Sequence, residues 1–265
     1  MKIWHISDTH TYHNLLEIPE NIDMVIHSGD CSNPRDPYNN EPEVRNFIDW
    51  YKELPIKHKV FVAGNHDTSI EKRLVTKKDF EDNGITYLEN EYATICGVKL
   101  FGSPHTPQFG QWAFMKDRVK LERFWSKAIN ELCDIIIVHG PPKGILDKSY
   151  DRNNYMESCG DKSLLNRVLE IEPSYMCFGH IHNTKDIINA GVFKLSNSKT
   201  LFSNGSVVTD GKFGKLTSNG NIFEINKCPK CHQTNGVHKM GCETRKILIN
   251  IMEEDEKLGL YDEER

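Results

Sequence analysis

Short apolar runs that stop at polar residues recur between residues 2 and 178 of the chain. The first run begins at Lys2, alternates along the chain and carries β-branched residues, a pattern typical of a strand. It ends at Asp8 and His10. Comparable runs predict four further strands, at 23–27, 59–63, 134–138 and 175–178.

Segments with helical spacing of apolar residues separate these strands. They cover residues 43–54, 69–83, 121–132 and 161–171. The alternation of strands and helices predicts a layered α/β sheet, in which ligands bind outside the carboxyl ends of the strands. We expect a loop at 33–42, which is rich in Pro, Asn and Asp. We also expect a second, antiparallel sheet in the turn-punctuated segment 186–226.

Each predicted strand ends in side chains that can bind a metal ion. They are Asp8, His10, Asp30, Asn65, His66, His139, His180 and His182. Oxygen and nitrogen donors without cysteine suit Mn²⁺, Fe²⁺ or Zn²⁺ in an open catalytic site. The set is too large for one ion, and it fits two divalent cations about 3.5–4 Å apart that share a carboxylate.

The order of these motifs resembles that of the calcineurin-like metallophosphoesterases. The series is Asp-x-His at 8, Gly-Asp at 29, Gly-Asn-His-Asp at 64, His-Gly at 139 and Gly-His-x-His at 179. Ser-Pro-His-Thr-Pro at 103, the Trp112 loop, His-Gly-Pro-Pro at 139 and Phe-Gly-His-Ile-His at 178 look like the cyclic-nucleotide-phosphodiesterase-like branch that contains the mammalian MPPED proteins. The resemblance covers about residues 1–226. It implies a four-layer α/β/β/α sandwich of two mixed sheets flanked by helices.

The resemblance also implies a role for each matching residue. Asp8, His10 and His182 would hold one ion, Asn65, His139 and His180 would hold the other, and Asp30 would bridge them. A bridging carboxylate offsets the repulsion between two dications, and a water between them becomes a hydroxide nucleophile near neutral pH. His66 is then the expected general acid for the leaving oxygen, and Asp67 would orient His66 and raise its pKa.

Four further residues are candidate substrate contacts. His13, three residues after His10, either reaches a substrate phosphate or is an exposed loop histidine. Trp112 belongs to an aromatic loop that either stacks on a base or packs on the body of the domain. His105 stands where this branch commonly has an aromatic residue, and it either faces the substrate or is an ordinary loop residue. Asn204 resembles a late asparagine of the family that lies near the substrate.

Composition narrows the class of protein further. The 265 residues carry a formal net charge of −5, without the large basic surface of a dedicated nucleic-acid binder. No apolar run approaches the roughly 20 residues of a membrane span, and the first strand leaves no room for a signal peptide. We therefore expect a cytoplasmic protein without a membrane partner. Its eight cysteines are then free thiols or metal ligands rather than disulfides.

The C-terminal segment lies outside the phosphoesterase pattern. Cys228, Cys231, His238 and Cys242 have the spacing C-x2-C-x6-H-x3-C, which predicts a structural Zn²⁺ site in a module at 227–246, with His232 as a rival ligand. This module carries five basic residues and one acidic residue. We expect a helical acidic tail at 247–265, with seven acidic and two basic residues in 253–265.

The sequence favours a dinuclear metal-dependent phosphodiesterase that acts on cyclic nucleotides or related small phosphodiesters. A protein phosphatase fits less well, because Cys-Ser-Asn follows Asp30 where those enzymes carry a longer Gly-Asp motif with an Asp-Arg-Gly end. A nuclease anchored by the zinc module is a less favoured alternative. A non-catalytic scaffold with the same fold is another, although every expected metal position is filled.

Overall fold

The computed structural model describes residues 1–209 and 214–226. Its strands are β1 Lys2–Ile6, β2 Met24–His27, β3 His58–Phe61, β4 Ile85–Tyr87, β5 Glu91–Ile95, β6 Val98–Ser103, β7 Thr106–Pro107, β8 Met115–Lys116, β9 Ile135–Val138, β10 Lys148–Tyr150, β11 Met156–Ser158, β12 Tyr175–Phe178, β13 Gly191–Lys194, β14 Leu201–Asn204 and β15 Asn221–Glu224. Its helices are α1 Pro37–Glu53, α2 Thr68–Glu71, α3 Lys77–Glu81, α4 Arg118–Ala128 and α5 Lys162–Ile171, with a 3₁₀ turn, η1, at Tyr12–Leu15.

Two mixed sheets form the centre of the unit Met1–Glu224, which also contains the two-stranded sheets β7-β8 and β10-β11. The first has the order β15-β1-β2-β3-β4, in which β15 is antiparallel and the other neighbours are parallel. The second has the order β13-β14-β12-β9-β6-β5, with a parallel centre and an antiparallel strand at each edge. The prediction of two mixed sheets flanked by helices is confirmed.

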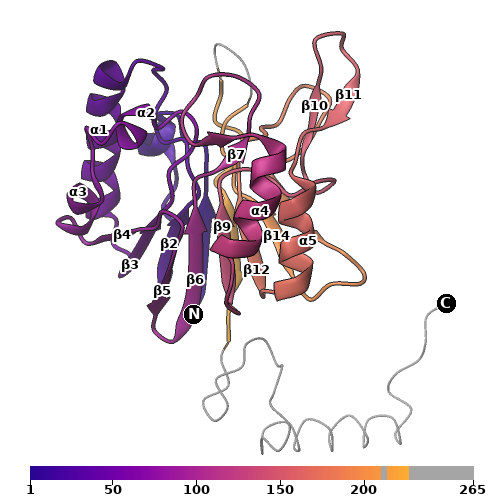
Figure 1. The fold of residues 1–265 in the computed structure, drawn as a ribbon. Coiled ribbons are helices and arrows are strands. Elements are labelled where there is room, and N and C mark those ends of the chain that lie inside the picture. The colour runs from indigo at the N-terminus through magenta and orange to yellow at the C-terminus, as the bar shows by residue number, and fades with distance from the viewer. Residues whose placement is uncertain (210–213, 227–265) are drawn as a thin grey trace, which may run out of the picture. The chain divides into compact units, whose positions relative to one another are not determined.

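Each sheet has its own helices (Figure 1). Phe47 and Tyr51 of α1 share a buried core with Trp4 and Phe61 of the first sheet. Trp125 of α4 and Val168 of α5 belong to a second core, which includes residues of β6, β9, β12 and β14. Between the sheets, the Nδ1 atom of His5 on β1 lies 2.8 Å from the hydroxyl oxygen of Ser203 on β14. The complete four-layer order stays a prediction.

Two of the predicted helices differ in the structure. The loop expected at 33–42 is wrong from Pro37 onward, because Asp36 caps α1 through the Asn39 N–H and Pro37 supplies a favourable first helical residue. The helix expected at 69–83 is divided into α2 and α3. Arg73 has a φ of +61°, which ends the first, and a Thr76–Asp79 capping box starts the second.

The second antiparallel sheet expected within 186–226 is also wrong. Its strands join the two sheets already described: β14 runs parallel to β12, β13 pairs with β14, and β15 pairs with β1. Alternating residues identify a strand but leave its partner open, because pairing depends on segments distant in sequence.

The carboxyl ends of β1, β2, β3, β9 and β12 lead directly into the loops that carry the predicted metal ligands. Among the described residues, no helix combines the length and apolarity needed to cross a bilayer. The zinc module predicted at 227–246, with Cys228, Cys231, His238 and Cys242, and the helical tail predicted at 247–265 lie outside the described residues.

Candidate metal centre

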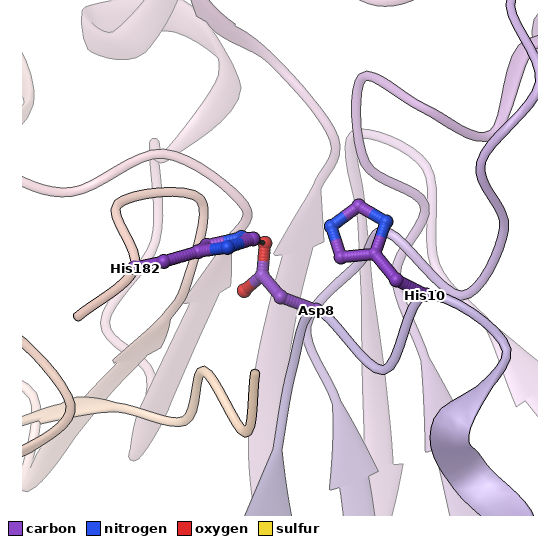
Figure 2. A group of neighbouring side chains, drawn as sticks. All are labelled: Asp8, His10 and His182. Carbon is purple, nitrogen blue, oxygen red and sulfur yellow. Dashed lines mark hydrogen bonds and ion pairs between the residues drawn. The ribbon is translucent and has the colours of Figure 1, made fainter. Parts of the chain in front are cut away.

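The strand ends bring six predicted ligands into two groups, Asp8 with His10 and His182, and Asp30 with His139 and His180. Within each group, the candidate ligand atoms all lie within 4.8 Å of one another. Figure 2 shows the first group, in which Asp8 lies between the two imidazoles. Strands β1 and β2 belong to the first sheet, whereas β9 and β12 belong to the second. Each group therefore forms only because the two sheets have their carboxyl ends at the same place.

Asp8 is fully buried, and several hydrogen bonds hold its carboxylate in place. The backbone N–H of His180 donates to Oδ2 at 2.9 Å, and the Ser206 hydroxyl donates to the same oxygen at 2.8 Å. The Nε2 atom of His182 lies 3.0 Å from Oδ1. The carboxylate thus ties the end of β1 to the loop after β12.

Two histidines are oriented by backbone carbonyls. His10 donates its Nδ1–H to the carbonyl of Ser32 at 3.0 Å, and His139 donates its own to the carbonyl of Ser28 at 2.9 Å. Each Nε2 then faces Asp30, whose Oδ2 lies 4.0 Å from that of His10 and 3.2 Å from that of His139. Metal-binding histidines commonly have this second hydrogen bond, which fixes the tautomer and the ring.

Asn65 completes the second group. Its side chain is buried, and its Oδ1 lies 3.0 Å from Nε2 of His139. The donor set therefore comprises carboxylates, imidazoles and one amide oxygen, which fits divalent cations such as Mn²⁺, Fe²⁺ or Zn²⁺. The residues present fit a two-ion centre.

Backbone strain is concentrated at these positions. Asp8, His10, Asp30 and His180 have φ values of +53°, +42°, +59° and +70°. This left-handed conformation is unfavourable for residues with a side chain and persists where the surroundings impose it. The strain turns the chain sharply at the strand ends, so that the side chains converge rather than alternate.

Two glycines make room for the carboxylates. A Cβ atom on Gly64 would lie 2.2 Å from Oδ1 of Asp30, and one on Gly179 would lie 2.0 Å from Oδ2 of Asp8. Both distances are far below van der Waals contact, so a side chain at either position displaces the carboxylate. The glycines of Gly-Asn-His-Asp and Gly-His-x-His are thus required by close approach.

The electrostatics match a cluster built to hold cations. Burial opposes ionisation of Asp8 and Asp30, but the neighbouring histidines outweigh burial and lower the pKa of both carboxyls. Burial lowers the pKa of His10 to about 4 and that of His180 to about 3. For His139 burial acts in the same direction, but Asp30 outweighs it and raises the pKa of His139 to about 9.

His66 lies beside the metal groups rather than within them. Its ring is 4.8 Å from that of His10 and 4.1 Å from that of Trp112. Its Nδ1 donates to the carbonyl of Asn33 at 3.0 Å, so a backbone group orients the imidazole. The expectation that Asp67 orients His66 is wrong.

Asp67 instead organises the loops that carry Asp30. Its buried carboxylate accepts hydrogen bonds from the backbone N–H of Gly64 at 2.7 Å and of Asp30 at 3.0 Å, and from the Ser32 hydroxyl at 2.7 Å. Burial and the nearby charge of Asp30 raise the pKa of the Asp67 carboxyl. Asp67 therefore positions Asp30, and through Gly64 it positions the loop that leads to Asn65.

A cavity of about 760 Å³ opens over the metal groups. Asp30, Asn65, His66, His180 and His182 line one end of it. Trp112 also lines it, and so does Phe109, whose ring lies 5.2 Å from that of His180.

The other three expected substrate contacts lie elsewhere. His13 is buried beside Phe47, with Nε2 3.0 Å from Oδ1 of Asn46. His105 is buried against Phe124, and its Nδ1 donates to the carbonyl of Phe114 at 2.8 Å. Both are packing residues, because their loops fold inward onto the helices.

Asn204 is fully buried and acts on the backbone. Its amide nitrogen donates to the carbonyl of Ile181 at 3.0 Å, and its Oδ1 accepts from the N–H of Ser206 at 3.0 Å. It therefore supports the loop between His180 and His182 and the chain leading to Ser206, rather than facing the substrate.

Sequence reasoning missed the groups that orient the ligands. The carbonyls of Ser28, Ser32 and Asn33 fix three imidazoles, and Ser206 fixes Asp8. A carbonyl has no residue-type signature, so the sequence held no signal for it. Ser206 lies two residues after Asn204, and that proximity was the one available hint.

Comparison with known proteins agrees with this geometry. The family described as Calcineurin-like phosphoesterase matches residues 1–184. UPF0046 protein K07C11.7 of Caenorhabditis elegans is 32% identical over 225 residues, which cover 80% of this chain and 71% of that protein. Metallophosphoesterase domain-containing protein 1 of Homo sapiens is 31% identical over 229 residues, which cover 77% of this chain and 65% of that protein, just under two thirds of its length.

Solved structures show the same fold at low identity. Phosphopantetheinyl Hydrolase (PptH) from Mycobacterium tuberculosis superposes with a TM-score of 0.53 at 14% identity, covering 78% of this chain and 89% of that one. The protein TT1561 of Thermus thermophilus gives a TM-score of 0.53 at 12% identity, covering 77% of this chain and 88% of that one.

Proposed function

We propose that this chain, which belongs to the calcineurin-like phosphoesterase family of metal-dependent hydrolases, hydrolyses small phosphodiesters such as cyclic nucleotides. The observation that carries the proposal is the position of Asp30. Its Oδ2 faces Nε2 of His10 in one group of ligands and Nε2 of His139 in the other. A single carboxylate shared between two ligand groups is the arrangement that a two-ion phosphoesterase requires.

The ligand assignment follows from the two groups. Asp8, His10 and His182 would hold one divalent cation. Asn65, His139 and His180 would hold the other, and Asp30, which lies between the two groups, would contribute to both sites. Two such cations, when bound, activate water as a nucleophile and stabilise charge on the phosphoryl oxygens. The oxygen and nitrogen donors leave Mn²⁺, Fe²⁺ and Zn²⁺ as the candidate ions.

His66 supplies the proton for the leaving oxygen. Because its Nδ1 donates to the carbonyl of Asn33, Nε2 is the atom available to a substrate in the cavity. General acid catalysis of this kind matters most for leaving groups that are poor as anions. Trp112 packs against the same imidazole and limits its movement.

Hydrolysis of a substrate panel tests the proposal. The panel contains 3′,5′- and 2′,3′-cyclic nucleotides, bis(p-nitrophenyl) phosphate, p-nitrophenyl phosphate and short single-stranded DNA, each with Mn²⁺ and with EDTA. We expect Mn²⁺-dependent turnover in which small diesters exceed the monoester and the single strands. Equal turnover of the monoester contradicts the diesterase proposal, and preferred cleavage of single strands supports a nuclease instead.

We further propose that the module at 227–246 binds one structural Zn²⁺ through Cys228, Cys231, His238 and Cys242. The proposal rests on the spacing of three thiolates and one imidazole, which is that of small zinc modules. Zinc content per chain, measured by elemental analysis, is expected to fall by one ion in Cys228→Ser. An unchanged zinc content sinks this proposal, and Cys96→Ser serves as the control for loss of an exposed thiol.

A further inference from the structure

Besides the candidate metal ligands, the cavity is lined by a group of basic residues, which we call the basic wall. Arg118, Lys143 and Lys162 form it, together with the carboxylate of Glu157. Arg118 and Lys162 are the first residues of α4 and α5, and Lys143 lies in the loop after β9. Segments from three parts of the chain therefore place cationic side chains on the same cavity.

Two of these cations are held by neutral backbone groups. Arg118 donates from Nη1 to the carbonyl of Gly160 at 2.9 Å and from Nη2 to that of Cys159 at 2.7 Å. Lys143 donates to the carbonyl of Ser158. In the part of the chain that the structure describes, none of the three cations forms an ion pair with a carboxylate. The wall therefore carries three positive charges against the single negative charge of Glu157.

Both contacted side chains keep donors for a ligand. A guanidinium has more N–H groups than the two carbonyls occupy, and an ammonium has more than one. The loop that accepts these bonds is itself fixed, because the buried carboxylate of Asp147 accepts from the N–H of Gly144 and of Gly160, both at 2.9 Å. The charged groups of Arg118 and Lys143 are thus positioned before a ligand arrives, which limits the entropy lost on binding.

Helix stability does not account for two of the cations. A positive charge in the first turn of a helix opposes the helix dipole, which favours anions at that end. Arg118 and Lys162 both occupy the first helical position, next to the capping residues Asp117 and Asp161. An anion bound in the cavity would attract both positive charges and offset their unfavourable interaction with the helix dipoles.

From this wall we infer that the substrate carries a second phosphate, remote from the phosphodiester that is cleaved. The inference rests on the proposed diesterase function and names the class of substrate. The cleaved diester lies at the metal end, the organic part passes Phe109, and a terminal phosphate monoester binds Arg118, Lys143 and Lys162. Charge-assisted hydrogen bonds from arginine and lysine are the usual recognition of such a dianion.

A matched pair of substrates tests the inference. Adenosine 2′,3′-cyclic phosphate and the same compound with a 5′-phosphate share the bond to be cleaved and differ in the remote phosphate. With the Mn²⁺-loaded full chain, we expect kcat/KM to be at least about tenfold higher for the 5′-phosphorylated compound. Equal values for the two compounds overturn the inference.

Variants of the wall locate the effect. Lys162→Gln is the cleanest, because the ammonium of Lys162 has no described contact whose loss disturbs the loop. We expect this variant and Arg118→Gln to reduce the preference for the 5′-phosphate severalfold, with turnover of bis(p-nitrophenyl) phosphate within about twofold of wild type. Arg123→Gln removes the same charge from α4 away from the cavity and is expected to leave the preference intact.

A binding measurement separates this inference from the proposed activity. Adenosine 3′,5′-bisphosphate and adenosine 3′-phosphate are compared by calorimetry on the Mn²⁺-loaded protein. Tighter binding of the bisphosphate that is lost in Lys162→Gln supports the second site even if no diester is hydrolysed. Hydrolysis of bis(p-nitrophenyl) phosphate without any preference for the bisphosphate leaves the diesterase standing and rejects the second site.

Discussion

The two ends of the cavity are built in opposite ways. At the metal end, Asp8 and Asp30 are buried, strained in the backbone and bonded by fixed N–H groups. At the basic wall, Lys162 is exposed and Arg118 begins a helix at the surface. A substitution at the metal end should therefore disturb the site strongly, whereas a substitution at the basic wall should disturb its surroundings little.

This difference follows the demands of the two tasks. Metal ligands must be held to a fraction of an ångström, because charge stabilisation depends on preorganised groups in a site with little water. Recognition of a remote anion needs only positive charge at about the right distance, which surface side chains on loops and helix ends can supply. We therefore expect substitutions at the metal end to cause large losses of Mn²⁺ affinity and activity, and substitutions elsewhere to cause smaller ones.

The largest effect is expected from Gly64→Ala, which alters no ligand. Its new Cβ would lie 2.2 Å from Oδ1 of Asp30, so the carboxylate must move and the site holding the second ion is lost. We expect Mn²⁺ binding at that site to weaken by at least about a hundredfold and nearly all turnover to be lost. The same result is expected for Asp30→Asn, which removes the carboxylate charge directly. Calorimetric titration with Mn²⁺ measures the affinity and stoichiometry.

Gly110→Ala, in the loop between Phe109 and Trp112, provides the matched control. The nearest atom to its new Cβ, on Trp112, lies 3.5 Å away, so no rearrangement is required. Wild-type Mn²⁺ binding is expected for this variant. Two ions bound to Gly64→Ala with unchanged affinity would show that the metal end is less rigid than the geometry indicates.

The next effect is that of His66→Ala. Because His66 belongs to neither ligand group, both ions are expected to stay bound. Its removal takes away the proposed general acid, and kcat should fall by about 10²–10⁴ for a substrate with an alkoxide leaving group. The loss should be much smaller with p-nitrophenolate, and rates for both leaving groups provide the measurement. Equal losses for the two, or loss of an ion, contradict the assigned role.

A smaller and graded effect is expected from pH. In the metal-free protein Asp30 raises the pKa of His139 to about 9, whereas burial keeps the pKa of His180 at about 3. The cation must therefore displace one proton, from His139, at neutral pH. We expect affinity at this site to rise up to about tenfold per pH unit from pH 7 to 8 and to level off above 9. Titrations in buffers of different ionisation enthalpy report the proton, and release of none at pH 7.5 rejects this account.

The smallest effect on catalysis is expected at His105. Since His105 packs against Phe124 and lies outside the cavity lining, His105→Phe should change kcat/KM by less than about threefold. It removes one of the two donors to the carbonyl of Phe114, which still accepts from the N–H of Thr106 at 3.3 Å, so the free energy of unfolding should fall by only about 0.5–1.5 kcal/mol. Denaturant titration and steady-state kinetics check both. Trp112→Ala is the contrasting variant, since it releases His66 and should lower kcat/KM by about tenfold or more.

Many of the strands and helices could be predicted because they depend on local patterns of apolar residues. The strands at β1, β2, β9 and β12 follow from short apolar runs, and the alternation with helices indicated the α/β class. The errors lie where local pattern is ambiguous, as in the divided helix around Arg73 and in the strands β14 and β15, whose partners are distant in sequence.

The sequence alone determined which residues carry metal-binding atoms and that each follows a strand, because residue type and β periodicity are local properties. Only the tertiary structure decided what each group touches. It turned Asp67 toward the Asp30 loop, gave His66 a carbonyl partner at Asn33, and buried His13 away from the cavity. It also gathered Arg118 and Lys162 on one wall. Such contacts depend on how two sheets and the chain between them pack, and no periodicity in the sequence encodes a backbone carbonyl or a neighbour about a hundred residues away.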